Sequence, residues 1–193
     1  MKIAIIKYNA GNIQSVQFAL ERIGVPATLT DDASLIKTAD RVIFPGVGEA
    51  SSAMRYLKDR NLDKIIVSLT QPVLGICLGM QLMCTHSEEN DTNCLGVFET
   101  PVKKFSGNLK IPHTGWNNIK FENDSLFSGI AAESYCYFVH SYYAETGEHS
   151  SAITEHGQPF SSALHKNNFY GVQFHPEKSG AVGQQILENF INL

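Results

Sequence analysis

The sequence predicts an α/β fold: a doubly wound, mostly parallel sheet with helices on both faces and a small antiparallel β annex. Two observations support this prediction. In the first half, short apolar runs alternate with segments of helical periodicity, as in strand–helix–strand units around a parallel sheet. Between residues 97 and 144 the pattern changes to short β-like pieces separated by Gly, Asn and Pro turns, which is typical of antiparallel strands.

Four runs in the first half have the composition of strands, and the most apolar of them read as buried on both faces. They are Ile3–Ile6, 27–29, Arg41–Phe44 and Val73–Ile76. Apolar residues with helical spacing follow these runs, and Gly24 is a stop signal for the first helix. The expected helices cover 16–23, 49–57 and 78–83, and residues 65–69 form an element whose type is left open.

The second half contributes further strands and one helix. The expected strands include 135–139, 162–165 and 170–174, and residues 182–191 have the pattern of a final amphipathic helix. The chain shows no internal repeat, low-complexity tract or linker. Because 193 residues suit one compact core, we expect residues 1–193 to be a single domain.

Composition excludes several classes of function. The net charge is −4 and no Lys/Arg-rich block occurs, which argues against nucleic-acid binding. The longest apolar runs, such as Ile3–Ile6, are far too short to cross a bilayer. The first residues lack the apolar core of a signal peptide and read as a strand. We therefore expect a cytoplasmic protein without a membrane segment.

The cysteines do not suggest disulfides or a metal site. Cys77, Cys84, Cys94 and Cys136 include no C-x-x-C pair of the kind that binds zinc, and disulfides are rare in cytosolic chains. We expect the last three to be buried structural thiols. Cys77 is different because of its surroundings.

Cys77 lies where a buried strand runs directly into a helix, in the segment V-L-G-I-C-L-G-M-Q at 73–81. Gly75 and Gly79 allow a sharp turn and a close approach of neighbouring elements. A strand–turn–helix elbow of this kind exposes a nucleophile, and the helix N-terminus favours a thiolate. A buried cysteine at a glycine-rich strand end is usually just a small hydrophobe, so on its own the segment is only suggestive.

A second segment, H-P-E at 175–177, could provide a base and the group that orients it. In an extended backbone His175 and Glu177 would point to the same side, about 6–7 Å apart. The carboxylate could then hold one imidazole nitrogen while the other faces outward, as in hydrolase triads. An isolated H-P-E would more often be a surface loop, so its meaning depends on Cys77.

A third segment, P-G-V-G at 45–48, ends another predicted strand. Its glycines free the backbone to turn an N–H toward a developing oxyanion. Alone it would be an ordinary turn. All three segments follow predicted strands, and open α/β sheets build their sites at the carboxyl ends of strands. Together they predict a nucleophilic cysteine site.

At these residues the chain resembles the class I (triad) glutamine amidotransferases. Further motifs are similar to the glutaminase-subunit family of imidazole glycerol phosphate synthase, and the resemblance runs essentially from end to end. These motifs are Y-N-A-G-N at 8–12, P-G-V-G at 45–48, P-H-T-G-W-N at 112–117 and Y-F-V-H-S-Y at 137–142. Lys7, where family members often have Asp, and the segment N-C-L-G at 93–96 depart from the usual pattern without touching the triad.

The resemblance implies a glutaminase that needs no metal or cofactor. Cys77 would attack the carboxamide of L-glutamine, with His175 and Glu177 completing the triad. The implied oxyanion donors are backbone N–H groups of Val47, Gly48 and Leu78. The implied glutamine-binding residues are Gly48, Gln81, Ser141 and Tyr142.

The resemblance also implies a partner, a cyclase subunit with a (β/α)₈ barrel, in a heterodimer. Ammonia would pass to it internally for the synthesis of imidazole glycerol phosphate and aminoimidazole carboxamide ribonucleotide in L-histidine biosynthesis. The implied docking and gating residues are Pro112, Trp116, Tyr137 and Lys178. The family further implies weak activity until the partner binds its ligand, so the turn at 45–48 would have to flip an N–H into the site.

Three alternatives remain open. Another triad amidotransferase, such as the glutaminase of pyridoxal phosphate synthesis, fits less well because of the segments at 45–48 and 112–117. A non-catalytic binding module on the same fold would be expected to lack a triad residue, and this chain has all three. A cysteine peptidase would differ in the electrophiles that label Cys77.

Overall fold

The computed structural model describes residues 1–122 and 124–193, and its centre is a set of five parallel strands. Their spatial order is β2 (Ala27–Thr30), β1 (Ile3–Ile6), β3 (Arg41–Phe44), β4 (Val73–Ile76) and β14 (Phe169–Val172). The chain leaves β1 toward β2 on one side and returns to β3 on the other. Such a reversal opens a crevice at the carboxyl ends of the strands, where α/β sheets bind ligands.

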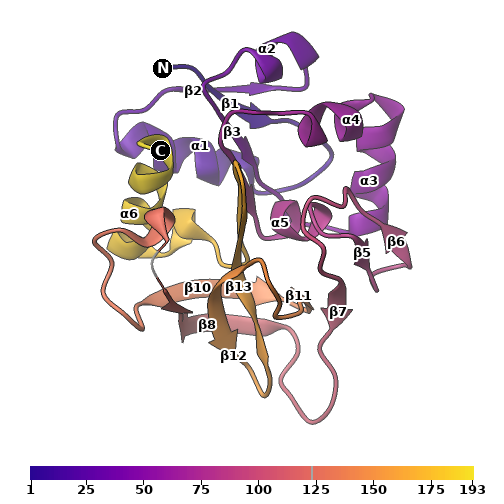
Figure 1. Cartoon of the computed structure of the whole chain (residues 1–193), viewed down its shortest axis with the longest axis vertical. Coiled ribbons are helices and arrows are strands. Elements are labelled where there is room, and N and C mark those ends of the chain that lie inside the picture. The colour runs from indigo at the N-terminus through magenta and orange to yellow at the C-terminus, as the bar shows by residue number, and fades with distance from the viewer. Residues whose placement is uncertain (123) are drawn as a thin grey trace.

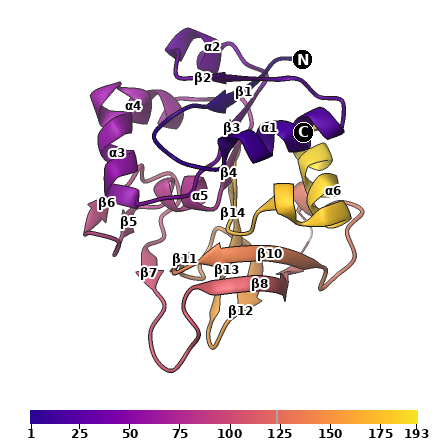
Figure 2. The same ribbon diagram turned by 180° about the vertical axis from the view of Figure 1, so that it is seen from behind.

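Helices cover both faces of this sheet (Figures 1 and 2). Alternate strand residues point to opposite faces, so Ile3 and Ile5 pack in one apolar cluster while Ala4 and Ile6 pack in the other. The first cluster includes residues of α1 (Ile13–Arg22) and α6 (Gly180–Ile191). The second includes residues of α2 (Ala33–Lys37), α3 (Ala50–Asp59), α4 (Leu62–Val67) and α5 (Leu78–Leu82).

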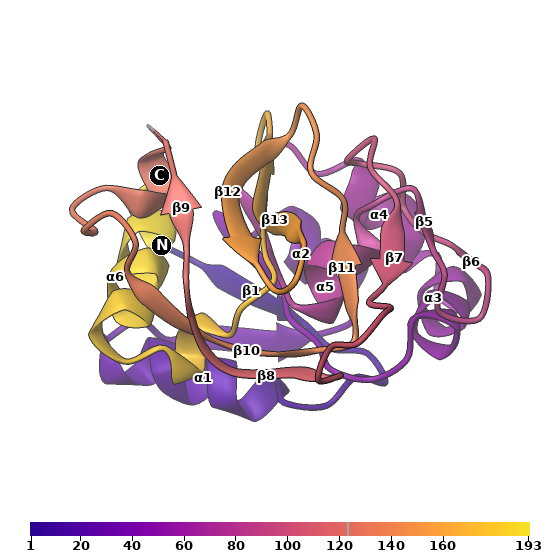
Figure 3. The same ribbon diagram turned by 90° about the horizontal axis from the view of Figure 1, so that it is seen from below.

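The antiparallel strands extend the same sheet beyond β14. They are β13 (Pro159–Lys166), β12 (Ser150–Glu155), β11 (Tyr142–Ala144), β9 (Lys120–Phe121) and β7 (Val102–Lys104). Next to β7 follow β5 (His86–Ser87), which runs parallel to it, and β6 (Thr92–Asn93). A separate antiparallel ribbon pairs β8 (His113–Asn118) with β10 (Tyr135–His140), and Figure 3 shows the two running side by side. Two 3₁₀ turns, η1 (Ser125–Phe127) and η2 (Pro176–Lys178), complete the described elements.

The predicted fold class is confirmed, with differences in detail. Of the element left open at 65–69, residues 65–67 are the end of helix α4, and residues 68 and 69 follow it. Helix α2 was not predicted because it has five residues of which only Ile36 is buried, too few to show a period. Strand β12 was not predicted because it is largely polar, with Ala152 and Thr154 as its buried residues.

Candidate active site

Cys77 lies at a strained elbow between β4 and α5. Its φ of 53° and ψ of −109° fall in a region that non-glycine residues rarely adopt. The backbone N–H of Cys77 donates to the carbonyl of Val172 on β14 at 2.7 Å, which fixes the elbow against the neighbouring strand. The side chain is buried. Helix α5 has only five residues, so its dipole can contribute little to the thiolate.

The two glycines around Cys77 allow the close packing that the elbow needs. A Cβ on Gly79 would lie 1.7 Å from the carbonyl oxygen of Phe44, and one on Gly75 would lie 2.4 Å from the Met83 methyl group. The first obstacle is backbone, which cannot move aside as a side chain can. Strand β3 therefore approaches α5 more closely than any residue except glycine permits.

We expect Gly79→Ala to lower the free energy of unfolding by about 3 kcal/mol, since overpacking against backbone outweighs the gain in helix propensity. Urea unfolding would measure this. Gly147→Ala is the matched control, because the nearest atom to its added Cβ is Thr100 Oγ1 at 4.0 Å. Equal stability of the two variants would contradict the close packing.

His175 and Glu177 meet, but not along an extended backbone as the sequence suggested. Pro176 begins the 3₁₀ turn η2, with His175 as its N-cap. His175 Nδ1 lies 2.7 Å from Glu177 Oε1, and the two side chains are 1% and 0% exposed. Asn12, in the loop after β1, also donates its Nδ2 to Glu177 Oε1 at 2.6 Å. Asn12 was not predicted to contact the triad.

The Cys77 thiol lies beside the free side of the imidazole. His175 Nε2 is buried and hydrogen-bonds no nitrogen or oxygen atom in the described part of the chain. Burial alone would lower the pKa of His175, but the nearby Cys77 and Glu177 outweigh it and raise this pKa to about 10. The geometry therefore favours an imidazolium that can pair with a thiolate.

Two of the three expected oxyanion donors, Val47 and Leu78, are not available in this conformation. The Leu78 N–H donates to the carbonyl of Gly46 at 3.1 Å, and the Gly11 N–H donates to the carbonyl of Val47 at 3.0 Å. Because a trans peptide opposes its C=O and N–H, the Val47 N–H points away from Leu78. In this conformation Leu78 is therefore already occupied, and Val47 is turned away from it.

A cavity of about 250 Å³ opens at Cys77. It gathers eight of the residues expected from the sequence: Val47, Gly48, Cys77, Leu78, Gln81, Pro112, Ser141 and Tyr142. Glu89, Val139 and His140 also line it. His175 and Glu177 are not among the residues that line it, whereas Cys77 is. A substrate in the cavity would therefore meet the thiol first.

Glu89 is a functional candidate that sequence reasoning missed. It lies in the turn between β5 and β6, and its Oε2 accepts the backbone N–H of Ala50 at 2.7 Å. Burial raises the pKa of this carboxyl group, with a smaller contribution from Glu49. In the sequence it sits in the acidic run H-S-E-E-N-D, which reads as a solvated turn.

Three of the expected docking residues lie together on the outer surface. Trp116 is 56% exposed, and its ring lies 6.1 Å from that of Tyr137, the residue opposite it in the β8–β10 ribbon. Lys178 Nζ lies 6.0 Å from the centre of the Tyr137 ring. Pro112 is exposed and also lines the cavity at Cys77. The backbone N–H of His175 donates to the Tyr137 carbonyl at 2.9 Å, so this surface touches the loop that carries His175.

The other three cysteines are free thiols. Cys84 and Cys136 are buried as expected, but Cys94 is only partly buried, which corrects the expectation for that residue. Burial raises the pKa of Cys84 well above its usual range, and raises that of Cys94 and Cys136 to about 12. All three are therefore protonated at neutral pH, which makes them poor nucleophiles.

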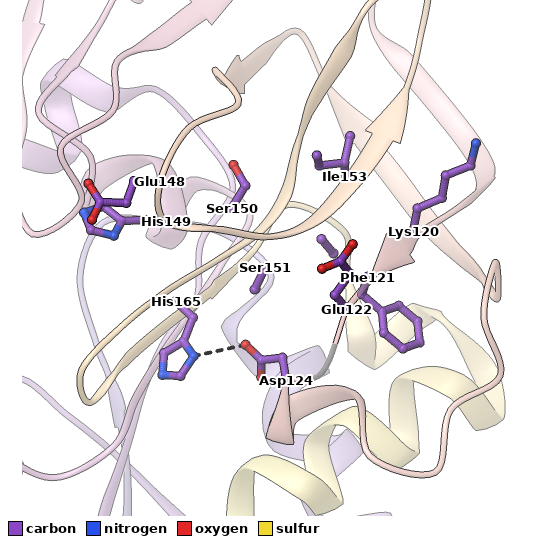
Figure 4. Close-up of a pocket in the computed structure, with 11 residues that line it drawn as sticks. Lys120, Phe121, Glu122, Asp124, Glu148, His149, Ser150, Ser151, Ile153 and His165 are labelled. Carbon is purple, nitrogen blue, oxygen red and sulfur yellow. Dashed lines mark hydrogen bonds and ion pairs between the residues drawn. The ribbon is translucent and has the colours of Figure 1, made fainter.

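A second cavity, of about 690 Å³, lies between β9, β12 and β13 (Figure 4). His165 Nδ1 is paired with Asp124 Oδ2 at 3.0 Å there, and His149 is paired with Glu99. It contains no cysteine. Across the described residues, no three His, Cys, Asp or Glu side chains gather as a metal site, and no helix is long and apolar enough to cross a membrane.

Comparisons with known proteins agree with this geometry. Residues 4–193 match the model of the family described as glutamine amidotransferase class-I. The imidazole glycerol phosphate synthase subunit HisH of Bacteroides fragilis (strain YCH46) is 55% identical over 100% of both chains. The subunit of the same name from Shewanella loihica is 48% identical over 98% of this chain and 89% of its own.

Solved structures show the same fold at low identity. A crystal structure of a glutamine amidotransferase superposes with a TM-score of 0.76 at 15% identity, covering 98% of this chain and 97% of that one. A chain of PurLQS from Thermotoga maritima gives a TM-score of 0.71 at 15% identity, covering 99% and 97%. With the family match over nearly the whole sequence, these findings show that the chain belongs to the class I glutamine amidotransferases.

Proposed function

We propose that this chain is the glutaminase subunit of an imidazole glycerol phosphate synthase. It hydrolyses L-glutamine to glutamate and ammonia, and the ammonia passes to a cyclase subunit. The observation that carries the proposal is the Cys77 thiol at a strained elbow, backed by the buried His175–Glu177 pair and open to a small cavity. The full-length similarity to subunits of that synthase supports the choice of pathway.

The chemistry follows from the positions of the three side chains. The Cys77 thiolate attacks the carboxamide carbon, and the C=O electrons move to oxygen to give a tetrahedral oxyanion. His175 then donates its Nε2 proton to the leaving nitrogen, and ammonia departs from a γ-glutamyl thioester. His175, now neutral, removes a proton from water, which attacks the thioester and releases glutamate. Glu177 holds the imidazole tautomer throughout.

The cavity supplies groups that suit an amino-acid substrate. Both protons of the Gln81 amide are used, on the Tyr142 carbonyl and on Gln173 Oε1, each at 2.8 Å. Only the Gln81 oxygen is left to accept a hydrogen bond from the substrate ammonium group, with the Glu89 carboxylate close by in the lining. Backbone groups of Gly48, Ser141 and Tyr142 hold the rest of the substrate.

The occupied oxyanion donors support a switch between resting and active forms. A flip of the Gly46–Val47 peptide would release the Leu78 N–H and turn the Val47 N–H into the site in one movement. The flip changes ψ of Gly46 and φ of Val47, and the lack of a side chain on Gly46 makes the rotation inexpensive. Low activity of the isolated chain follows, since the intermediate would lack its donors.

The partner is a cyclase subunit with a (β/α)₈ barrel, docked on the surface formed by Trp116, Tyr137 and Lys178 with Pro112 at its edge. Exposed aromatic side chains beside a cation are typical anchors of protein interfaces. The cyclase joins ammonia to an N′-substituted aminoimidazole carboxamide ribonucleotide during L-histidine synthesis. A cytoplasmic location fits the four free thiols.

The decisive experiment measures glutamate release from glutamine in three mixtures: the chain alone, the chain with a cyclase subunit, and both with the cyclase nucleotide. The rate is expected to rise about tenfold or more when the nucleotide is added. Equal rates in the three mixtures would reject the switch. No hydrolysis in any mixture would reject the function.

Trp116→Ala is expected to weaken cyclase binding by about 30-fold, the effect of losing a buried aromatic anchor. Isothermal titration calorimetry would measure the dissociation constant. Leu35→Ala is the control, because Leu35 on α2 is 48% exposed, close to the 56% of Trp116, and α2 lies at the opposite end of the molecule from β8 and β10 (Figures 1 and 2). Equal affinities of the two variants for the cyclase would show that the cyclase docks on another surface.

A further inference from the structure

The buried amide of Gln173 contacts the nucleophile directly. Gln173 follows β14, is 0% exposed, and donates its Nε2 to Cys77 Sγ at 3.6 Å. Its Oε1 accepts the Gln81 amide. We propose that Gln173 is a positioning residue whose side-chain N–H holds the Cys77 sulfur for attack and favours its thiolate form. This proposal deepens the glutaminase function and rests on it.

The orientation of the Gln81 and Gln173 side-chain amides follows from the Tyr142 carbonyl, to which Gln81 is hydrogen-bonded. The Tyr142 carbonyl can only accept, so the Gln81 atom beside it is the NH₂ group. That NH₂ group also contacts Gln173, so the Gln173 atom facing it is the oxygen. The Gln173 NH₂ group must then face the Cys77 sulfur. Only one assignment of nitrogen and oxygen in the Gln81 and Gln173 side chains satisfies all of these hydrogen bonds.

The Tyr142 carbonyl is itself held by a histidine that lines the cavity. His140 Nδ1 lies 2.7 Å from it and must be the donor. His140 Nε2 is then free to accept from His113 Nδ1 at 3.0 Å, and His113 Nε2 accepts from Asn117 Nδ2 at 3.2 Å. Burial lowers the pKa of His140 to about 3 and that of His113 to about 4, so both remain neutral near pH 7. A continuous set of hydrogen bonds thus runs from strand β8 to Cys77.

An N–H directed at the sulfur has a larger effect on the thiolate than on the thiol. Neutral sulfur is a weak acceptor, whereas hydrogen bonds to charged groups are about twice as strong as neutral ones. Cys77 is buried, and a buried charge loses its hydration at a cost in free energy. The Gln173 N–H offsets part of this cost without supplying a proton to the reaction. It also restricts the rotation of the sulfur about the strained elbow.

The test replaces Gln173 with methionine, which has a similar length and no donor, and compares it with Ser162→Ala. Ser162 accepts the Gln173 backbone N–H through its carbonyl, and its own buried hydroxyl has no partner among the described residues. Cys77 alkylation by iodoacetamide is followed across pH with the isolated chain. Glutamine hydrolysis is measured with the cyclase subunit and its nucleotide present.

In Gln173→Met the pH midpoint of alkylation is expected to rise by about one unit, and kcat to fall about 10- to 100-fold with KM changed less than about threefold. Ser162→Ala is expected to behave as the wild type in both assays. A wild-type alkylation midpoint in Gln173→Met would overturn the proposal. If the wild type fails to hydrolyse glutamine, the proposed function is wrong. The alkylation assay does not depend on hydrolysis and still tests whether Gln173 stabilises the Cys77 thiolate.

A measurement on the unmodified protein guards against a Gln173→Met variant that does not fold. The side-chain ¹⁵N–¹H signals of Gln173 are expected to shift as Cys77 titrates. The same shift should be absent in Cys77→Ala. Signals that do not respond to pH in the wild type, or that respond equally in Cys77→Ala, would show that the amide does not sense the sulfur and would overturn the proposal.

Discussion

Replacing Cys77 with alanine is expected to reduce glutamine hydrolysis by at least about 10⁴-fold in the complex with the cyclase, because no other group can form the thioester. Glutamate release is the measurement. Cys94→Ala, which removes the partly buried thiol, should retain wild-type activity. Ammonia release by Cys77→Ala at more than a few per cent of the wild-type rate would show that Cys77 is not the nucleophile.

The same variant should change the titration of His175. Because Cys77 is among the groups that raise the pKa of His175 to about 10, its removal leaves burial opposed by Glu177 alone. The pKa of His175 in Cys77→Ala is therefore expected to be lower than in the wild type. NMR titration of the imidazole would measure it, and an unchanged value would mean that the two side chains do not interact.

Replacing Glu177 with glutamine is expected to lower kcat by about 10³- to 10⁴-fold, as the loss of charge does in other triads. The side chain keeps its shape, and its oxygen can still accept from His175 and Asn12. Its NH₂ group would replace Glu177 Oε2, which is buried with no partner in the described ranges, and would itself lack an acceptor. Glu148→Gln, at an exposed position, is the control.

Stability should respond to pH in the same Glu177→Gln variant. The pKa of His175 in the folded protein, about 10, exceeds its ordinary value of 6.5. Protonation therefore stabilises the fold fully below pH 6.5, and this stabilisation is lost as the pH rises through 10. The difference in free energy of unfolding between wild type and variant should shrink over that interval. Urea unfolding at pH 6 and pH 10 would measure it, and a constant difference would contradict the interaction.

The sequence pointed to those parts of the proposed site whose chemistry lies in contiguous motifs. Cys77 between two glycines and the His175–Glu177 pair could be found because residue type and spacing state their chemistry directly. Glu89 and Gln173 could not, since their roles depend on which loops meet after folding. Neither an acidic turn nor a glutamine at a strand end has a distinctive local pattern.

The orientation of the turn at 45–48 could not be predicted from the sequence for a different reason. The segment P-G-V-G indicates that the backbone can rotate, but both orientations of the Gly46–Val47 peptide are compatible with it. The contact between Leu78 and Gly46 selects one of them in this structure. The 3₁₀ turn at Pro176 was missed because His175 and Glu177, two residues apart, could be brought together by either backbone.

The hydrogen bond between the Tyr137 carbonyl and the His175 N–H has a consequence for how this family can vary. It joins main-chain atoms, and the Tyr137 N–H also donates to the side-chain hydroxyl of Ser179. Substitutions on the outer face of β10 can therefore alter partner choice while leaving the imidazole in place. A one-residue insertion or deletion in β10 would shift its register and move the base away from the sulfur. Natural and engineered changes of partner should accordingly occur by substitution in this strand, with length changes confined to the loops on either side.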